Sequence, residues 1–347
     1  MKKIAFIMAI IVLLSFSGCQ SKEPSGNDNS SAVESRVYNN IVTAKEVVER
    51  DGYIYFIHYG VVYKKGLEEE TATKIAPYED YYEINKYRSA CLLDYEDLYA
   101  VFVDRDRVDS DKSRATFYNI SKEKTEKEVI LSGYVFEESI TACDNDIYYI
   151  TNLTSSSSRT LCLLKSSGEQ MPIATDVGSK YFVLKDKIRY YSESEKVFYE
   201  CDLDGYKRTV IETGIDKEKI FISHFYMDYI VVQTHTNETF IYNLENKKLQ
   251  IVPLWTNIER NGFADNYCYV NNYYTPVKIN LDDGTYSKIY DGLWVRLKVY
   301  KNYVYMDAVS SGTEDEPIEG PYPTGLYRVT LDGKDFKEIF LNSSLNG

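Results

Sequence analysis

The side chains that most often do chemistry are sparse in this sequence of 347 residues. It contains three histidines, His58, His224 and His235. Their spacing fits no metal-ligand pattern, and neither an H-E-x-x-H nor a G-x-S-x-G motif occurs. We therefore predict no catalytic residue, no metal site and no cofactor, and we expect these histidines at strand ends or on the surface.

Cysteine chemistry is limited in the same way. Beyond the N-terminal region the chain has five cysteines, Cys91, Cys143, Cys162, Cys201 and Cys268. An odd number cannot all pair, and their wide spacing is unlike that of a small disulfide scaffold. Cys162 and Cys201 precede Gly168 and Gly205 by offsets of equal parity, so both should face the same side of their strands. We expect buried thiols, with one disulfide as the alternative.

One acidic segment could be mistaken for a cation site. It contains Asp104, Asp106, Asp109 and Asp111. Interleaved arginines and a following lysine would compete with a metal ion, and the segment lacks the glycine and terminal glutamate of an EF-hand loop. We therefore treat these aspartates as candidate binding-loop residues.

The N-terminus carries the most specific chemistry. Lys2 and Lys3 precede an apolar run over residues 4–14, which is too short to span a bilayer and is typical of a signal peptide. Cys19 directly follows Ser17-Gly18, and this arrangement resembles the lipobox of bacterial lipoproteins. The resemblance implies that residues 1–18 are removed, that the thiol of Cys19 is acylated, and that the protein is extracytoplasmic and anchored to the bacterial cell membrane. Ordinary secretion is the alternative.

The charge of the chain limits its partners. It has 53 acidic and 40 basic side chains, a net charge of −13, which argues against nucleic acid because that ligand needs a cationic face. Residues 19–36 are polar and predict a flexible tether, which leaves residues 37–342 as one folded domain. Anionic lipid should repel so acidic a domain, so we expect membrane contact only through the lipid on Cys19, and a monomer.

A repeated pattern predicts the elements that must position any site. A polar turn followed by an aromatic, strand-like run recurs seven times, at intervals of 36 to 49 residues. Tyrosine, of which the chain has 34 copies, is a strand former and is prominent in these runs. The apolar residues that anchor the seven copies are Ile54, Leu98, Ile147, Ile188, Ile230, Cys268 and Val304.

Each copy has room for four short strands. Asp-Gly pairs that end at Gly205, Gly284 and Gly333 mark tight hairpins, because glycine supplies the positive φ of such turns. Four-stranded units of about 40–50 residues are the signature of a β-propeller. We predict an all-β propeller of seven four-stranded blades, with six or eight blades as the alternatives. Asn40–Ala44 could add to the last blade and close the ring, and most tyrosines should fill the wedges between blades with hydroxyls that reach the solvent.

Two segments carry a resemblance to a known family. Ile147-Tyr-Tyr149 after a polar turn, and Leu326-Tyr-Arg-Val-Thr-Leu-Asp-Gly333, resemble the YWTD-type propeller repeats of the low-density-lipoprotein receptor. They resemble still more the related repeats of bacterial lipoproteins of unknown function. The chain has no Tyr-Trp-Thr-Asp tetrapeptide, and its seven repeats exceed the six of the receptor type. The resemblance implies a propeller and extracellular binding, and it supplies no catalytic residue.

The connections between second and third strands give the best functional hint. We predict long connections over residues 104–114, 152–159 and 310–325, which would share one sector of one face. The candidate binding residues there, besides the four aspartates, are Asn152, Glu314, Asp315, Glu316 and Tyr322.

These patterns lead to one functional hypothesis and its rivals. We predict a binding or scaffold module for a protein or peptide partner at the cell envelope. A glycan-active enzyme that uses acids of a central channel, or a passive carbohydrate-binding module, is the alternative.

Overall fold

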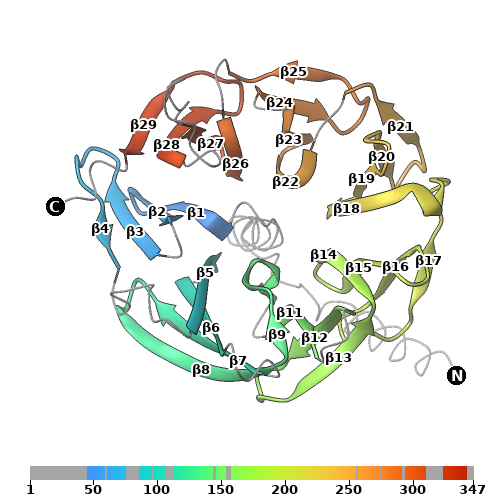
Figure 1. Ribbon diagram of the computed structural model, residues 1–347, viewed down its shortest axis with the longest axis horizontal. Coiled ribbons are helices and arrows are strands. Elements are labelled where there is room, and N and C mark those ends of the chain that lie inside the picture. Colours follow the sequence, from blue (N-terminus) through green and yellow to red (C-terminus); the bar gives the residue numbers. More distant parts are fainter. Residues whose placement is uncertain are drawn as a thin grey trace, which may run out of the picture. The chain divides into compact units, whose positions relative to one another are not determined.

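The computed structural model describes residues 45–58, 61–75, 86–95, 97–106, 112–143, 146–153, 158–254, 257–272, 275–290, 294–309 and 323–341. These residues form seven antiparallel sheets, each made from one continuous stretch of chain. Within a sheet, strands that follow one another in sequence also pair in space, except at the inner edge of the third sheet, and the sheets stand around a common axis as the blades of a β-propeller (Figure 1). The predicted all-β fold with seven blades is confirmed.

In every blade the first strand lies nearest the axis and the last lies at the rim (Figure 1). Blade 1 contains β1 (Val47–Arg50), β2 (Tyr53–His58), β3 (Val61–Gly66) and β4 (Thr73–Lys74); blade 2 contains β5 (Lys86–Asp94), β6 (Leu98–Asp106), β7 (Lys112–Asn119) and β8 (Lys124–Ser132). Blade 3 contains β9 (Tyr134–Val135), the 3₁₀ turn η2 (Glu137–Ser139), β10 (Thr141–Cys143), β11 (Asp146–Asn152), β12 (Thr160–Leu164) and β13 (Gln170–Thr175); blade 4 contains β14 (Val177–Val183), β15 (Lys187–Ser192), β16 (Val197–Asp202) and β17 (Thr209–Ile211). The 3₁₀ turn η3 (Lys217–Lys219) leads into blade 5, which contains β18 (Ile220–Tyr226), β19 (Tyr229–Thr234), β20 (Thr239–Asn243) and β21 (Leu249–Val252); blade 6 contains β22 (Asn257–Ala264), β23 (Tyr267–Asn272), β24 (Thr275–Asn280) and β25 (Tyr286–Lys288); and blade 7 contains β26 (Trp294–Tyr300), β27 (Tyr303–Val309), β28 (Pro323–Thr330) and β29 (Lys337–Leu341).

The aromatic repeats form the second strand of each blade. The seven anchor residues lie in β2, β6, β11, β15, β19, β23 and β27, and all are buried. The second strand of each blade has a neighbouring blade on each face, so the side chains on both of its faces are buried. Rim strands differ: in β8 six of the nine side chains from Lys124 to Ser132 are largely exposed. The sequence signal is therefore strongest where a strand is buried on both faces.

The Asp-Gly turns join the third and fourth strands, and they also join neighbouring blades. Gly205 and Gly333 have φ angles of +84° and +83°, as the hairpin prediction required. A Cβ atom at Gly333 would lie 2.0 Å from the carbonyl oxygen of Ile289 in the preceding blade, and one at Gly205 would lie 2.9 Å from the Ile173 side chain. Each turn thus rests on the rim of the blade before it, at a distance that only glycine permits.

Side chains join the last blade to the first. Glu49 of β1 accepts hydrogen bonds from the Tyr305 hydroxyl and from Arg328, each at 2.8 Å. The Phe340 ring of β29 packs 5.1 Å from that of Phe56 in β2. Asn40–Ala44, which we predicted to add to the last blade, lie outside the described residues.

Several tyrosines do not place their hydroxyls in solvent, so that expectation was wrong for them. Tyr148 of blade 3 donates to the Leu203 carbonyl of blade 4, and Tyr181 of blade 4 donates to the Ser139 carbonyl of blade 3. The wedge between two blades brings backbone carbonyls of one blade within reach of the other, and a buried hydroxyl requires such a partner.

We expect Tyr305→Phe to lower the free energy of unfolding by about 1–2 kcal/mol, because it removes one hydrogen bond to the partly buried Glu49 carboxylate. Tyr206→Phe is the control, because Tyr206 lies in a turn and is largely exposed. Urea titration measures both variants. Equal stability of the two would show that the bond to Glu49 does not contribute to ring closure.

The five described cysteines are buried thiols, as predicted. Cys162 packs in the cluster that joins blades 2 and 3, and Cys201 packs in the cluster that joins blades 3 and 4. Each therefore faces the preceding blade, which confirms the predicted common orientation. Burial raises the pKa of the Cys162 thiol to about 11, so it is un-ionised at neutral pH.

Candidate functional site: a hub beside the propeller axis

The inner strands are irregular at one end of the ring. In blades 4 to 7 the pairing of the first strand with the second shifts register near the start of the first strand. Phe221 is the extra residue of one such β-bulge, between Ile220 and Ile222, and its side chain is 61% exposed. Bulges re-aim side chains, and they are frequent next to functional sites. The connections between second and third strands leave the blades at this same end.

Blade 3 departs further from regular pairing. Its inner edge is split into β9 and β10, which pair with opposite ends of β11. The 3₁₀ turn η2 lies between them and projects toward the axis (Figure 1). We call residues 133–141 the hub. Strands of blade 2 and blade 4 both pack against η2.

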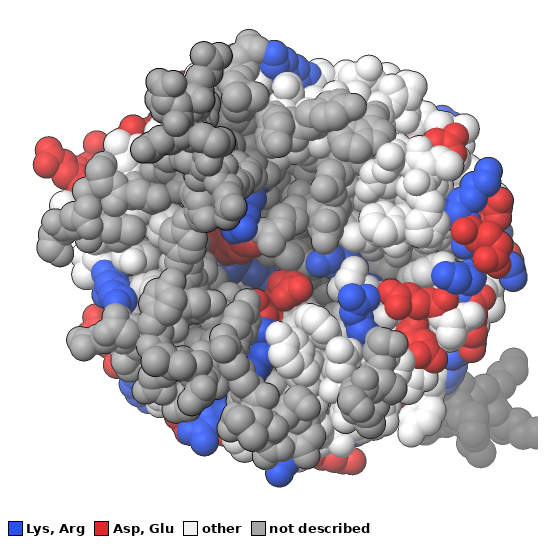
Figure 2. Space-filling view, in the orientation of Figure 1, with Lys and Arg blue, Asp and Glu red and all other residues white. Residues whose placement is uncertain are grey.

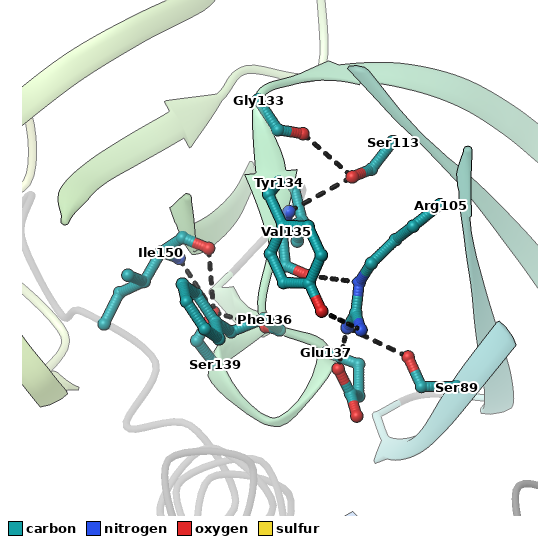
Figure 3. Close-up of polar contacts among 10 residues, drawn as sticks. All are labelled: Ser89, Arg105, Ser113, Gly133, Tyr134, Val135, Phe136, Glu137, Ser139 and Ile150. Carbon is teal, nitrogen blue, oxygen red and sulfur yellow. Dashed lines mark hydrogen bonds and ion pairs between the residues drawn. The ribbon is translucent and has the colours of Figure 1, made fainter. Parts of the chain in front are cut away.

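Arg105 of blade 2 contacts both the backbone of the hub and two hub side chains. Its Nε donates to the Val135 carbonyl at 2.8 Å, and its Nη1 donates to the Tyr134 hydroxyl at 3.0 Å. Its Nη2 donates to the Ser89 hydroxyl at 3.1 Å and forms an ion pair with Glu137 (Figure 3). Burial raises the pKa of the Glu137 carboxyl, and the Arg105 charge acts against that rise.

Serine hydroxyls satisfy the rest of the hub backbone. Ser113 donates to the Gly133 carbonyl and accepts from the Val135 amide. Ser139 donates to the Phe136 carbonyl at 2.6 Å and accepts from the Ile150 amide at 2.8 Å (Figure 3). With the bond from Tyr181 described above, blades 2, 3 and 4 all hold the hub. This irregular segment is therefore well ordered by its polar contacts.

A lysine from blade 1 also reaches the hub. Lys45, just before β1, is 2% exposed, and its Nζ donates to the Glu138 carbonyl and to the Thr141 hydroxyl, both at 3.0 Å. Burial lowers the pKa of Lys45 to about 7.

A second buried lysine on the inner side of the ring has acidic partners. Lys298 of β26 lies 3.1 Å from Asp307 and 3.6 Å from Glu46. Side chains of both charge signs gather around the hollow at the centre of the molecule (Figure 2). Within the described residues, no group of three or more His, Cys, Asp or Glu side chains could hold a metal ion.

The hub presents a partly exposed aromatic surface. Tyr134 and Phe136 meet edge to face at 5.5 Å, and the Arg159 guanidinium lies 5.6 Å from the centre of the Phe136 ring. Leu153, which follows the end of β11, is 39% exposed. We call Tyr134, Phe136, Leu153 and Arg159 the blade 3 patch. Aromatic rings and arginine are the side chains most enriched at binding hot spots.

Three of the predicted site residues, Asp104, Asp106 and Asn152, lie in the described part of the chain. Asp104 lies within β6, where it pairs with Arg114 of β7, and Asp106 is the last residue of β6. The strands of blade 2 are longer than predicted, so the connection covers residues 107–111 only. Asn152 ends β11 and pairs with Tyr134, which brings it beside the blade 3 patch. The other predicted loop residues, and the lipidation site, lie outside the described residues: Asp109, Asp111, Glu314, Asp315, Glu316, Tyr322 and Cys19.

The histidines were predicted correctly in two cases and wrongly in one. His58 ends β2 and His235 lies in an exposed turn. His224 instead is buried in β18, and burial lowers its pKa well below the usual value, so the ring is neutral at neutral pH. The His224 ring lies 6.5 Å from the ring of Phe263 in blade 6.

Comparisons with known proteins concern the fold and not the function. No protein-family model and no curated protein matches the sequence. The chain is similar to the computationally designed Ika8 protein, at 8% identity over 84% of this chain and 85% of that chain, with a TM-score of 0.50. A chain of the nidogen/laminin complex matches at 10% identity over 68% of this chain and 92% of that chain, with a TM-score of 0.40. The likeness to the designed protein concerns the fold alone. The protein is a seven-bladed β-propeller, and no helix among the described residues is long and apolar enough to cross a membrane.

Proposed function

We propose that this protein is a lipid-anchored, extracytoplasmic propeller that binds a protein or peptide partner of the cell envelope. The observation that carries the proposal is the blade 3 patch on the hub. Its aromatic side chains are partly exposed, while hydrogen bonds from blades 2, 3 and 4 fix the backbone beneath them. A surface that is ordered before binding loses less entropy when a partner docks.

The charges on the inner side of the ring also favour binding over catalysis. Glu137 is paired with Arg105, and Asp307 is paired with Lys298. Each of these carboxylates is held by a cation of the ring itself, so a substrate would have to displace that cation to reach it. We therefore propose no catalytic residue on this face.

The membrane anchor is the second part of the proposal. It rests on the basic start, the apolar run and the Ser17-Gly18-Cys19 sequence. We expect Cys19→Ala to move the protein from the membrane fraction to the soluble extracytoplasmic fraction and to abolish incorporation of a labelled fatty acid. Wild-type protein that incorporates no label would contradict lipidation.

The binding claim is tested by crosslinking the full-length protein in its own envelope, followed by affinity recovery. We expect Phe136→Ala combined with Arg159→Ala to reduce recovery of a specific partner at least tenfold. Tyr286→Ala is the matched control, because it removes an exposed aromatic ring from the rim of blade 6. Equal recovery from all three proteins would reject the patch, and hydrolysis or binding of a glycan panel without any protein partner would favour the glycan alternative.

A further inference from the structure

Lys45 makes a contact between blades that are not neighbours. It precedes β1, yet its amine binds the hub of blade 3 and so bypasses blade 2. Both acceptors, the Glu138 carbonyl and the Thr141 hydroxyl, are neutral groups. The side chain is buried, so water does not complete its hydrogen bonding from outside.

The number of acceptors matches an un-ionised amine. A neutral amine has two N–H groups, and Lys45 has two acceptors among the described residues. An ammonium group has three N–H donors and would leave one of them without a partner in this arrangement. Lys298 shows how the ring accommodates a charged lysine, because both oxygens of Asp307 lie 3.1 Å from its Nζ.

The charged and titratable groups that face Lys45 do not compensate an ammonium charge. Cys91 of β5 faces it, and burial raises the pKa of that thiol to about 12, so it is neutral at physiological pH. Lys180 of β14 adds positive charge, and the side chain of Glu138 on η2 exerts a weaker opposing effect. Glu46, the next residue along, pairs with Lys298. Burial therefore dominates and favours the neutral form.

We propose that Lys45 is a pH-sensitive latch: its neutral amine fastens the hub to blade 1, and its protonation releases the hub and loosens the blade 3 patch. The latch is supported by the burial of Lys45 and by its contacts with the hub. Its effect on a partner rests on the function proposed above.

The direction of the pH dependence follows from linkage. The pKa of Lys45 is lowered from 10.5 to about 7 in the closed state, so closing the latch releases a proton. The closed state therefore gains stability as pH rises from about 7 toward 10.5, and this gain is lost as pH falls to 7. With these two pKa values, the equilibrium constant for closing the latch rises about tenfold between pH 6 and pH 8.

Hydrogen exchange of the full-length protein, corrected for the intrinsic pH dependence of exchange, tests this device. We expect protection of residues 133–141 to rise about tenfold from pH 6 to pH 8 in the wild type and to stay constant in Lys45→Met. Lys298→Met is the control: it removes a buried lysine with acidic partners and should leave the pH dependence intact. The same pH dependence in Lys45→Met as in the wild type would overturn the latch.

A direct titration keeps the proposal falsifiable if Lys45→Met does not fold. Nuclear magnetic resonance of wild-type protein labelled at the lysine ε-carbon reports the charge of each lysine, and Lys45→Gln serves as a second variant for assignment. A Lys45 signal that titrates near pH 7 supports the latch, whereas one that stays charged at pH 9 rejects it. Intact latch behaviour combined with unchanged partner recovery from the patch variant would reject the proposed function and leave the latch standing.

Discussion

Gly333→Ala should lower the free energy of unfolding by about 2–4 kcal/mol. Two costs combine at this position. The backbone has a φ of +83°, which disfavours alanine by about 1 kcal/mol. The new Cβ would also lie 2.0 Å from the carbonyl oxygen of Ile289, so the turn must move away from the rim of the preceding blade. Strain of this kind adds about 1–3 kcal/mol.

Gly168→Ala separates these two costs. Gly168 has a φ of +90° in the corresponding turn of blade 3, but a Cβ there would meet no atom within 4 Å. We expect this variant to lose only about 1 kcal/mol, the backbone share. Urea titrations of the two variants and the wild type give the comparison. If both variants lose the same amount, the docking of the Gly333 turn on the preceding rim does not matter for stability.

Arg105→Met should be the most damaging single change at the hub, with a loss of about 3–5 kcal/mol. It removes the partner of the partly buried Glu137 carboxylate and leaves the Val135 carbonyl without its Arg105 bond. Adding Glu137→Gln removes the unpaired carboxylate charge, so the double variant should regain part of the lost free energy of unfolding. The Glu137→Gln single variant completes the double-mutant cycle, which measures the coupling between the two side chains.

An exposed ion pair provides the control for Arg105. Arg208 and Glu195 lie 2.7 Å apart on the outside of blade 4, with roughly two-fifths of each side chain exposed. We expect Arg208→Met to cost less than about 1 kcal/mol, because water screens the pair. Chemical denaturation again measures the loss. If Glu137→Gln fails to rescue Arg105→Met, the loss comes from packing and not from the buried charge.

The sequence predicted the fold well because each blade repeats the same physical problem. Every second strand is covered on both faces, so residues such as Ile54, Ile188 and Val304 recur at a regular interval in the chain. The Asp-Gly turns add a second signal at a fixed place in the repeat, since positive φ favours glycine. These features are local, so they can be recognised in a single sequence without knowing which blades are neighbours.

The candidate site could not be predicted in the same way, because its contacts cross between blades. Arg105 belongs to a strand of blade 2, and Lys45 lies more than 90 residues from its acceptors. Arg105 and Lys45 both contact the hub only because the ring is closed. The Gly133-Tyr-Val-Phe-Glu137 stretch was the available signal, because its aromatic residues stand outside the regular repeat. Asp104 was misplaced for a local reason: a charged residue within a long strand has the same composition as a loop.

The manner in which the ring closes has a mechanical consequence. Among the described residues, each blade comes from a single stretch of chain, and no described strand of one blade is hydrogen-bonded into another. In the described part of the chain, side chains join blades 7 and 1, among them Glu49 with Tyr305 and Phe56 with Phe340. A pulling force on the chain ends would load these contacts before any β-ladder. We expect the molecule to yield at this joint and then to unravel one blade at a time, with a force plateau for each blade.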